Sequence, residues 1–375
     1  MAPMSLTRRA AVLGAAGAAV GSVTGFTRPA AHPARPFGRY GSPAGRRDDR
    51  TLYVDPQGRG DHTTVQAAVA ATPDNPAEGW TLVLAAAVYR ETVAVGAAKT
   101  GLTLLGATCD AADTVIVYDH ANGTPKPDGS GPYGTSGSAT TTVQADGFTA
   151  RDLTFANDWL RADHPEITGT QAVALKAMGD RAAFHDCRFL GHQDTLYADT
   201  PARTTIARQY FHRCYAEGDV DFVFGRATAV FDSCHFRTLN RTDLASAPYG
   251  FVFAPSTAGP TPYGYLVVRS HITSAAPDGF YRLARPWVPS SDTTAVPMLT
   301  VRDSLLGPGI NASEPYANMS ASYPWQSQRF REYRNSGPGA AIPVPASRPQ
   351  LTAGEAAAQT PADWFGDWAP WQKCR

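Results

Sequence analysis

The sequence has no excess of either charge. Lys and Arg together number 33, as do Asp and Glu, so the formal net charge at pH 7 is zero. Proteins that bind nucleic acid or lie on acidic membranes usually carry a basic face that appears in this balance. Charged residues of all kinds are scarce as well, at 18% of the chain. We therefore expect no nucleic-acid partner and no membrane partner.

Long apolar runs are also missing. Near the N-terminus, Arg8-Arg9 precedes a weakly apolar stretch at residues 10–20, which glycines interrupt and which is short for a membrane anchor. An arginine pair before such a stretch resembles a bacterial twin-arginine signal. We expect residues 1–31 to be this signal peptide and the protein to be secreted from a bacterial cell. Residues 32–50 are rich in Pro, Gly and Arg and predict a disordered linker, so residues 51–375 remain as one domain.

Cysteine is rare, with five in the chain, which permits at most two disulfides in an exported protein. We predict a bridge between Cys214 and Cys234, which would contribute roughly 3 kcal/mol in the chain-entropy model. Cys187 lies in an apolar run and is expected to be a buried thiol. The pairing of Cys109 and Cys374 stays open. Neither the cysteines nor the 9 histidines show a zinc-ligand spacing, so no metal or other cofactor is expected.

What the sequence has in abundance is turn residues, with 34 Gly and 30 Pro. Between them lie short apolar runs typical of strands, at residues 81–84, 102–105 and 114–117. An amphipathic helix is expected over residues 63–71. Near the C-terminus, the capping box at Thr352 predicts a short helix that Pro361 ends.

A weak repeat decides between β architectures. Each unit begins with an apolar residue, continues through a polar corner and often contains cysteine; the clear units begin at Phe184, Phe211 and Phe231, and looser ones at Ala150, Val268 and Val301. Irregular spacing of this kind suits a solenoid, which places the extra residues in loops, better than a sandwich. The prediction is an all-β fold, a right-handed parallel β-helix with short capping helices at its ends.

Two aspartates stand in unlike settings in this sequence. Asp194 lies between polar Gln193 and Thr195, whereas Asp221 precedes the apolar run at residues 222–224. Unlike settings separate carboxyl pKa values, so that one group can attack while the other keeps its proton. This pairing suits acyl or glycosyl transfer.

The spacing of these aspartates fits one turn of the solenoid. Gln171, Asp194 and Asp221 are each about one coil apart, and positions one coil apart stack at about 4.8 Å. We expect the three to form a column on one face. The loop at residues 122–138 would then wall a groove beside them.

Four segments carry a resemblance to a known family; in order they are Gln171–Leu175, Gly191–Tyr197, Asp221–Gly225 and Leu283–Trp287. Through them the chain resembles the pectin methylesterases, carbohydrate esterases built on a right-handed parallel β-helix. The similarity extends from about Leu52 to Trp368.

The resemblance implies a role for each matching residue. Asp221 would attack the methyl ester of a galacturonate unit in pectin, and Asp194 would protonate methanol and then activate water. Gln171 and Gln193 would stabilise the oxyanion, and Arg285 would hold the nucleophile. The implied substrate contacts are Thr135, Tyr197, Phe224, Trp287 and Met319. The implied partner is methylated homogalacturonan, bound by a monomer.

Two other functions remain open on the residues alone. One is a glycosidase or lyase on the same scaffold, because paired carboxyl groups also cleave glycosidic bonds. The other is a β-helix that binds sugar without catalysis. Two local features are also open: Ala284 stands where the family usually has Gly, and His192 is expected to be a solvated loop histidine.

Overall fold

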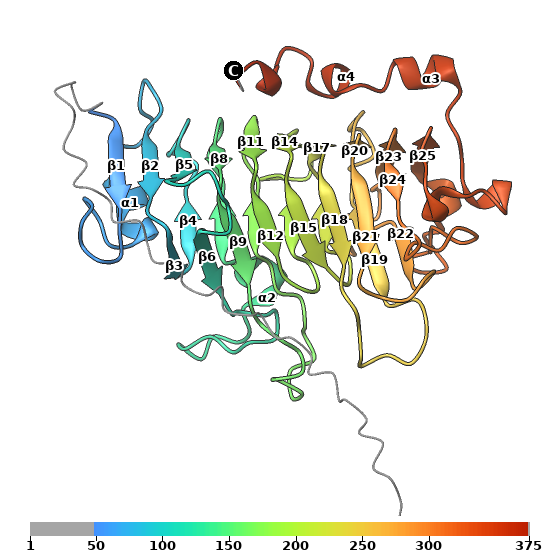
Figure 1. The fold of residues 1–375 in the computed structure, drawn as a ribbon, viewed down its shortest axis with the longest axis horizontal. Coiled ribbons are helices and arrows are strands. Elements are labelled where there is room, and N and C mark those ends of the chain that lie inside the picture. Colours follow the sequence, from blue (N-terminus) through green and yellow to red (C-terminus); the bar gives the residue numbers. More distant parts are fainter. Residues whose placement is uncertain (1–48, 374–375) are drawn as a thin grey trace, which may run out of the picture. The chain divides into compact units, whose positions relative to one another are not determined.

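The computed structural model describes residues 49–373, so the predicted signal peptide and nearly all of the predicted linker lie outside the described residues. Within this part of the chain, the strands form three parallel sheets of ten, seven and eight strands. The chain visits the sheets in rotation, so that each coil adds strands that pair with those of the coils before and after it (Figure 1). This architecture is a parallel β-helix, and the predicted fold is confirmed.

The ten-stranded sheet contains the repeat that was visible in the sequence. Its strands are β1 (Thr51–Val54), β2 (Thr81–Leu84), β5 (Thr103–Gly106), β8 (Thr149–Arg151), β11 (Ala182–His185), β14 (Arg208–His212), β17 (Thr228–Asp232), β20 (Tyr265–Val268), β23 (Met298–Arg302) and β25 (Arg329–Tyr333). Phe184, Phe211 and Phe231 pair in register and their rings stack inside the helix at centroid distances of 4.8 Å. The looser unit placed at Val268 begins one residue earlier, because Val267 pairs with Phe231.

The eight-stranded sheet follows the ten-stranded sheet after a sharp corner. Its strands are β3 (Ala87–Arg90), β6 (Thr114–Tyr118), β9 (Thr154–Asn157), β12 (Arg188–Leu190), β15 (Tyr215–Gly218), β18 (His235–Thr238), β21 (His271–Ser274) and β24 (Leu305–Leu306). Several corners contain a polar residue with positive φ, such as Asp186 at 54° and Ser233 at 57°. The chain enters the next strand directly after such a corner, which explains the polar corner of the repeat.

Three of these corners bring cysteines together, and here the predicted disulfide is wrong. Cys187, Cys214 and Cys234 are buried free thiols in consecutive coils, and exposed Cys109 is free as well. Corners that stack in register lie about 4.8 Å apart, whereas a disulfide needs Cβ atoms about 3.8 Å apart. The Sγ atoms of Cys214 and Cys234 instead donate to backbone carbonyl groups of the preceding coil, at 3.4 and 3.3 Å. The expected buried thiol at Cys187 is confirmed, and Cys374 lies outside the described residues.

The seven-stranded sheet positions the aspartates. Its strands are β4 (Val93–Val95), β7 (Thr141–Val143), β10 (Leu175–Ala177), β13 (Leu196–Ala198), β16 (Val223–Gly225), β19 (Gly250–Pro255) and β22 (Tyr281–Ala284). Leu196 pairs with Val223, which brings Asp194 and Asp221, each two residues earlier, to the same level. Because Leu175 pairs with Leu196, Gln171 lies two residues away from this level. The predicted column is therefore correct for the aspartates and wrong for Gln171.

Short helices lie outside the sheets: α1 (Val65–Ala71), α2 (Gly134–Gly137), α3 (Ala353–Ala357), α4 (Pro361–Phe365), η1 (Trp325–Ser327), η2 (Pro338–Ala340), η3 (Pro345–Ser347) and η4 (Pro370–Lys373). Helix α1, capped by Thr64, and helix α3, with its capping box at Thr352, confirm the two predicted helices. Pro361 does not merely end α3. It begins α4, whose Trp364 and Phe365 pack on the outer face of the ten-stranded sheet.

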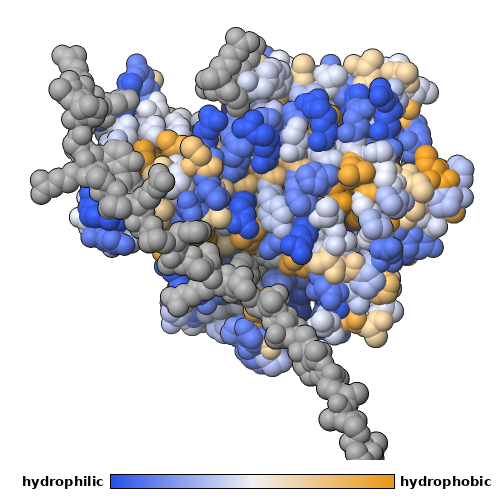
Figure 2. Space-filling view, in the orientation of Figure 1, coloured by the Kyte–Doolittle hydropathy of each residue, from blue (hydrophilic) through white to orange (hydrophobic). Residues whose placement is uncertain are grey.

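The surface of the described residues is mixed in character. On the face drawn in Figure 2, hydrophilic residues predominate and hydrophobic ones are scattered among them. Between residues 49 and 373 we find no helix with the length and hydrophobicity needed to cross a bilayer.

Candidate active site

A cleft of about 870 Å³ opens beside strands β10, β13, β16 and β19 of the seven-stranded sheet. It is lined by every residue that the sequence predicted to be catalytic or to contact substrate: Thr135, Gln171, Gln193, Asp194, Tyr197, Asp221, Phe224, Arg285, Trp287 and Met319. The predicted wall is present too, because residues 133–136 border the cleft. Residues far apart in the sequence thus reach one site, since the solenoid stacks them coil on coil.

The two aspartates lie in corners that have the same backbone shape. Asp194 has φ of 64° and Asp221 has φ of 49°, and each precedes a strand by two residues. Aspartate tolerates this left-handed conformation better than most residues do. Both side chains are nearly buried, at 7% and 8% exposure. The shared register and shared backbone shape bring the two carboxyl groups to the same face.

Arg285 binds Asp221 through both ends of its guanidinium group. Nε donates to Oδ1 at 2.8 Å and Nη2 donates to Oδ2 at 2.6 Å. The guanidinium also lies over the ring of Phe251, 4.3 Å from its centroid. Ala284 does not have positive φ and ends strand β22 in regular pairing with Phe253, so alanine at this position leaves Arg285 in place.

The two carboxyl groups differ in which contacts counteract the effect of burial on their pKa values. Burial raises the pKa of Asp221, and the hydrogen bonds and charge of Arg285 work against this rise. Burial, followed by the negative charge of Asp221, raises the pKa of Asp194 well above its usual range. No described residue donates a hydrogen bond to the Asp194 carboxyl group. The rise in pKa is therefore opposed by hydrogen bonds at Asp221 and by none at Asp194.

The cause of this difference is not the one that the local sequence indicated. Asp194 was expected to lie among polar partners, but Thr195 Oγ1 donates to the carbonyl oxygens of His192 and Glu217 instead. The contrast in pKa is present, and it arises because a distant residue, Arg285, donates hydrogen bonds to only one of the two carboxyl groups.

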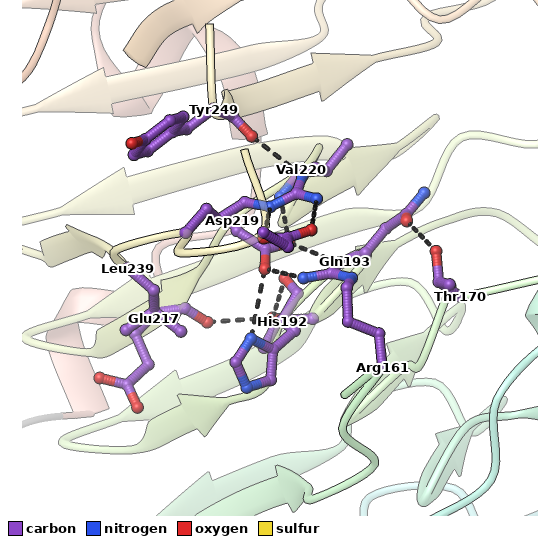
Figure 3. Close-up of polar contacts among 12 residues, drawn as sticks. Arg161, Thr170, His192, Gln193, Glu217, Asp219, Val220, Leu239 and Tyr249 are labelled. Carbon is purple, nitrogen blue, oxygen red and sulfur yellow. Dashed lines mark hydrogen bonds and ion pairs between the residues drawn. The ribbon is translucent and has the colours of Figure 1, made fainter. Parts of the chain in front are cut away.

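Two glutamine amides border the same space. Gln171 Oε1 accepts from Asn122 Nδ2 at 2.8 Å. Gln193 Oε1 accepts from Thr170 Oγ1 at 2.6 Å (Figure 3). With both amide oxygens engaged in this way, each side chain keeps its N–H groups for the cleft that it lines. Such neutral donors suit an oxyanion that forms beside a carboxylate.

Aromatic rings form one wall of the cleft. Tyr197 and Phe224 occupy neighbouring strands and stack with centroids 4.1 Å apart. Trp287 meets both rings edge-on, at 6.0 and 5.5 Å. Flat rings of this kind pack against the apolar faces of sugars, as expected for a polysaccharide cleft.

A charged group on this wall was not predicted from the sequence. Lys176 Nζ and Arg226 Nη1 both approach the buried carboxylate of Asp199, at 3.5 and 3.2 Å. Lys176 also lies 4.7 Å above the ring of Tyr197. Two cations share one carboxylate here, which leaves positive charge facing the cleft. The signal was available, since Lys176 and Arg226 each directly follow a recognised motif.

His192 is not the solvated histidine that was expected. Its side chain is 25% exposed, and Nδ1 lies 3.2 Å from Oδ2 of the buried Asp219 (Figure 3). Asp219 is a second residue that was not predicted from the sequence.

As for metals, the residues that the structure describes contain no group of three or more His, Cys, Asp or Glu side chains that could hold an ion.

Comparison with known proteins agrees with this geometry. A family model described as pectinesterase matches residues 51–360. A pectinesterase of Ralstonia nicotianae is 34% identical over 333 residues, which cover 81% of this chain and 83% of the relative. The chain belongs to the pectinesterase family, a family of carboxylic ester hydrolases.

Solved structures give the same result for the fold. Pectin methylesterase PemA from Erwinia chrysanthemi is 30% identical with a TM-score of 0.75, over 87% of this chain and 99% of that one. A pectin methylesterase in complex with a hexasaccharide, also 30% identical, has a TM-score of 0.75 over 85% of this chain and 97% of the other.

Proposed function

We propose that this protein hydrolyses methyl esters of galacturonate units in pectin, releasing methanol and leaving pectate, with Asp221 as the nucleophile. The observation that carries the assignment is the unequal pair of carboxyl groups in one cleft. Arg285 donates to both oxygens of Asp221 and opposes the rise of its pKa, whereas the pKa of Asp194 is raised by burial and by the charge of Asp221.

The first half of the reaction forms an acyl-enzyme. A carboxylate oxygen of Asp221 attacks the ester carbonyl carbon, and the carbonyl oxygen becomes negative. The amide N–H groups of Gln171 and Gln193 stabilise that charge. As the bond from carbon to the methoxy oxygen breaks, protonated Asp194 donates its proton and methanol departs. The substrate carbonyl is then bound to Asp221 as an anhydride.

The second half restores the enzyme. Asp194, now ionised, accepts a proton from a water molecule that attacks the substrate carbonyl carbon of the anhydride. The bond to the Asp221 oxygen breaks, which returns Asp221 as a carboxylate and releases the galacturonic acid carboxyl group, whose proton is then lost to solvent. One proton thus moves from Asp194 to methanol, and another from water to Asp194, so no metal or cofactor is required.

The substrate is proposed to be methylated homogalacturonan. The hexasaccharide bound by the related structure supports an extended sugar ligand. In this chain the cleft of about 870 Å³, with its aromatic wall at Tyr197, Phe224 and Trp287, has room for several sugar units. Thr135 and Met319 border the same space and are proposed as further contacts.

A product assay tests the function directly. The purified protein from residue 48 onward, incubated with highly methylated pectin, should release methanol while the polymer length stays constant. A glycosidase or lyase would shorten the polymer, and a non-catalytic binding protein would release nothing. Chelators should leave the rate unchanged.

Export and oligomeric state are part of the same proposal. Pectin lies outside bacterial cells, so the enzyme must be exported to reach it, and residues 1–31 are proposed to direct that export. N-terminal sequencing of secreted protein should give a start after Ala31. The protein is proposed to act as a monomer, because one chain supplies every residue of the site; light scattering should give the mass of one chain.

A further inference from the structure

A buried carboxylate lies behind the active site without belonging to it. Asp219 is 1% exposed and does not line the cleft. Arg161 donates to both of its oxygens, at 2.6 and 3.1 Å, and His192 Nδ1 lies 3.2 Å from Oδ2 (Figure 3). The backbone N–H of Val220 donates to Oδ1 at 2.7 Å. Every oxygen of this carboxylate is therefore held by at least two donors.

These contacts join the two corners that carry the catalytic aspartates. The backbone N–H of Asp219 donates to the carbonyl oxygen of His192 at 3.0 Å, and Asp194 follows His192 by two residues. Asp219 itself precedes Asp221 by two residues, and the N–H of Asp194 donates to the carbonyl oxygen of Val220 at 3.0 Å. A single residue thus connects both corners through its side chain and its backbone.

The loop that supplies Arg161 also supports the glutamine amides. It connects β9 with β10 and carries Thr170, whose hydroxyl group engages Gln193, and Gln171 itself. Arg161 is the residue of this loop that holds Asp219. The position of both amides relative to the aspartates therefore depends on the ion pair between Arg161 and Asp219.

We propose that Asp219 is a positioning residue for the de-esterification: held by Arg161 and His192, it fixes the corners of Asp194 and Asp221 and keeps a negative charge behind them. This role rests on the proposed function of the two aspartates. Left-handed backbone at both corners is a conformation that surrounding contacts must stabilise, and the Asp219 contacts meet that need.

The charge of Asp219 acts on the chemistry as well as on the geometry. Burial would raise the pKa of Asp219, but the hydrogen bonds from His192 and Arg161 outweigh it, so the pKa is lowered and the group stays ionised. Its charge contributes, after burial and nearer groups, to raising the pKa of Asp194 and of Asp221.

Among the described residues, few other groups act electrostatically on Asp219 and Asp194. The titratable or charged groups that interact with Asp219, besides the catalytic aspartates, are Arg161, His192, Arg241 and Tyr281. Those that interact with Asp194 are Asp219, Asp221, Arg285 and Tyr197.

Three variants separate this role from a merely structural one, with methanol release from pectin measured across pH. Asp219→Asn removes a negative charge, so both catalytic pKa values should fall and both limbs of the profile should move to lower pH. Arg161→Gln removes a positive charge, so both limbs should move to higher pH. The double variant, in which a neutral pair replaces the ion pair, should have limbs close to those of the parent. In all three, turnover should fall at least tenfold.

A control variant shows whether the shifts are specific to Asp219. Asp232→Asn breaks a similarly buried carboxylate that Arg269 holds through both nitrogens, on the ten-stranded sheet and away from the cleft, and should leave the profile unchanged.

The outcomes are distinct. Opposite shifts of the two single variants support the proposal, and restoration in the double variant supports it further. Folded single variants whose limbs stay with the parent's would overturn it. If Asp219→Asn does not fold, Arg161→Gln and the double variant decide the matter alone. A parent protein that releases no methanol from pectin would refute the proposed function instead.

Discussion

The corners of Asp194 and Asp221 are nearly identical in backbone and differ in one contact. Both have positive φ, both precede a strand of the same sheet by two residues, and both are buried to the same degree. Arg285 binds only Asp221, and Asp194 accepts no hydrogen bond from a described residue. Repetition of the coil therefore supplies two equivalent carboxyl groups, and one guanidinium from a later coil makes them unequal.

The largest expected effect comes from the corner that carries the nucleophile. Asp221→Asn keeps the size and most hydrogen bonds of the side chain and removes the attacking carboxylate. Turnover should fall well beyond 10³-fold, which corresponds to about 4 kcal/mol of barrier, while binding of pectin is retained. Methanol release and equilibrium binding measure the two quantities. A variant within tenfold of the parent's turnover would contradict the role of Asp221.

The corner that carries the acid should respond in a different way. Asp194→Asn should lower turnover on methyl esters by roughly 10³-fold, because general acid and base catalysis contributes about 10²–10⁴-fold. A nitrophenyl ester of an oligogalacturonate has a leaving group that needs no proton. On this ester the Asp194→Asn variant should show a fast burst of nitrophenol followed by slow turnover, and the Asp221→Asn variant should show no burst. Equal loss of the burst in both variants would mean that the corners are not divided into acid and nucleophile.

Removing the contact that distinguishes the corners should have a somewhat smaller effect. Arg285→Ala should lower turnover by roughly 10²-fold, as expected for the loss of charge-assisted hydrogen bonds. Arg285 lowers the pKa of Asp221, so without it that pKa rises and the acidic limb of the rate profile moves to higher pH. Arg285→Lys keeps the charge without the planar fork and should lose less on both counts. A limb that does not move in the alanine variant would limit Arg285 to positioning.

Most of the fold could be predicted from the sequence because a solenoid repeats one local rule. The repeat unit at Phe184, Phe211 and Phe231 predicts the stacked rings of the core directly. Its irregular spacing favours a solenoid over a sandwich. Register was the weaker part of the prediction. Leu175 pairs with Leu196, so one coil here is two residues shorter than the separation between Gln171 and Asp194. Counting residues alone therefore misplaced Gln171 by two positions, and the pairing of strands was needed to correct it.

The site was predicted by resemblance more than by local chemistry. Asp194 has polar neighbours in the sequence, yet they bond to other groups and leave its carboxyl group without a donor among the described residues. The ion pair between Arg161 and Asp219 joins residues 58 positions apart in the sequence. Lys176 and Arg226 come together only at Asp199. Neither arrangement can be recognised from a short stretch of sequence. Contacts that depend on folding over long separations need the structure.

The smallest expected effect concerns the disulfide near the Asp221 corner, which the structure lacks. A disulfide between Cys214 and Cys234 would clamp the segment of Asp221 covalently and leave the Asp194 corner without an equivalent. The structure has free thiols there, so both corners are held by packing and hydrogen bonds alone.

Reductant should therefore change neither stability nor activity. A bridge closing that loop would contribute about 3 kcal/mol, which for a domain of this size corresponds to a shift of several degrees in Tm. We expect Tm with and without dithiothreitol to agree within about 1 °C. Thiol alkylation should label Cys214 and Cys234 after denaturation without reduction and spare them in the folded protein, because both are buried. A Tm that falls in reductant, together with an unreduced peptide that joins the two residues, would show that the disulfide forms and that the Asp221 corner is the more rigid of the two.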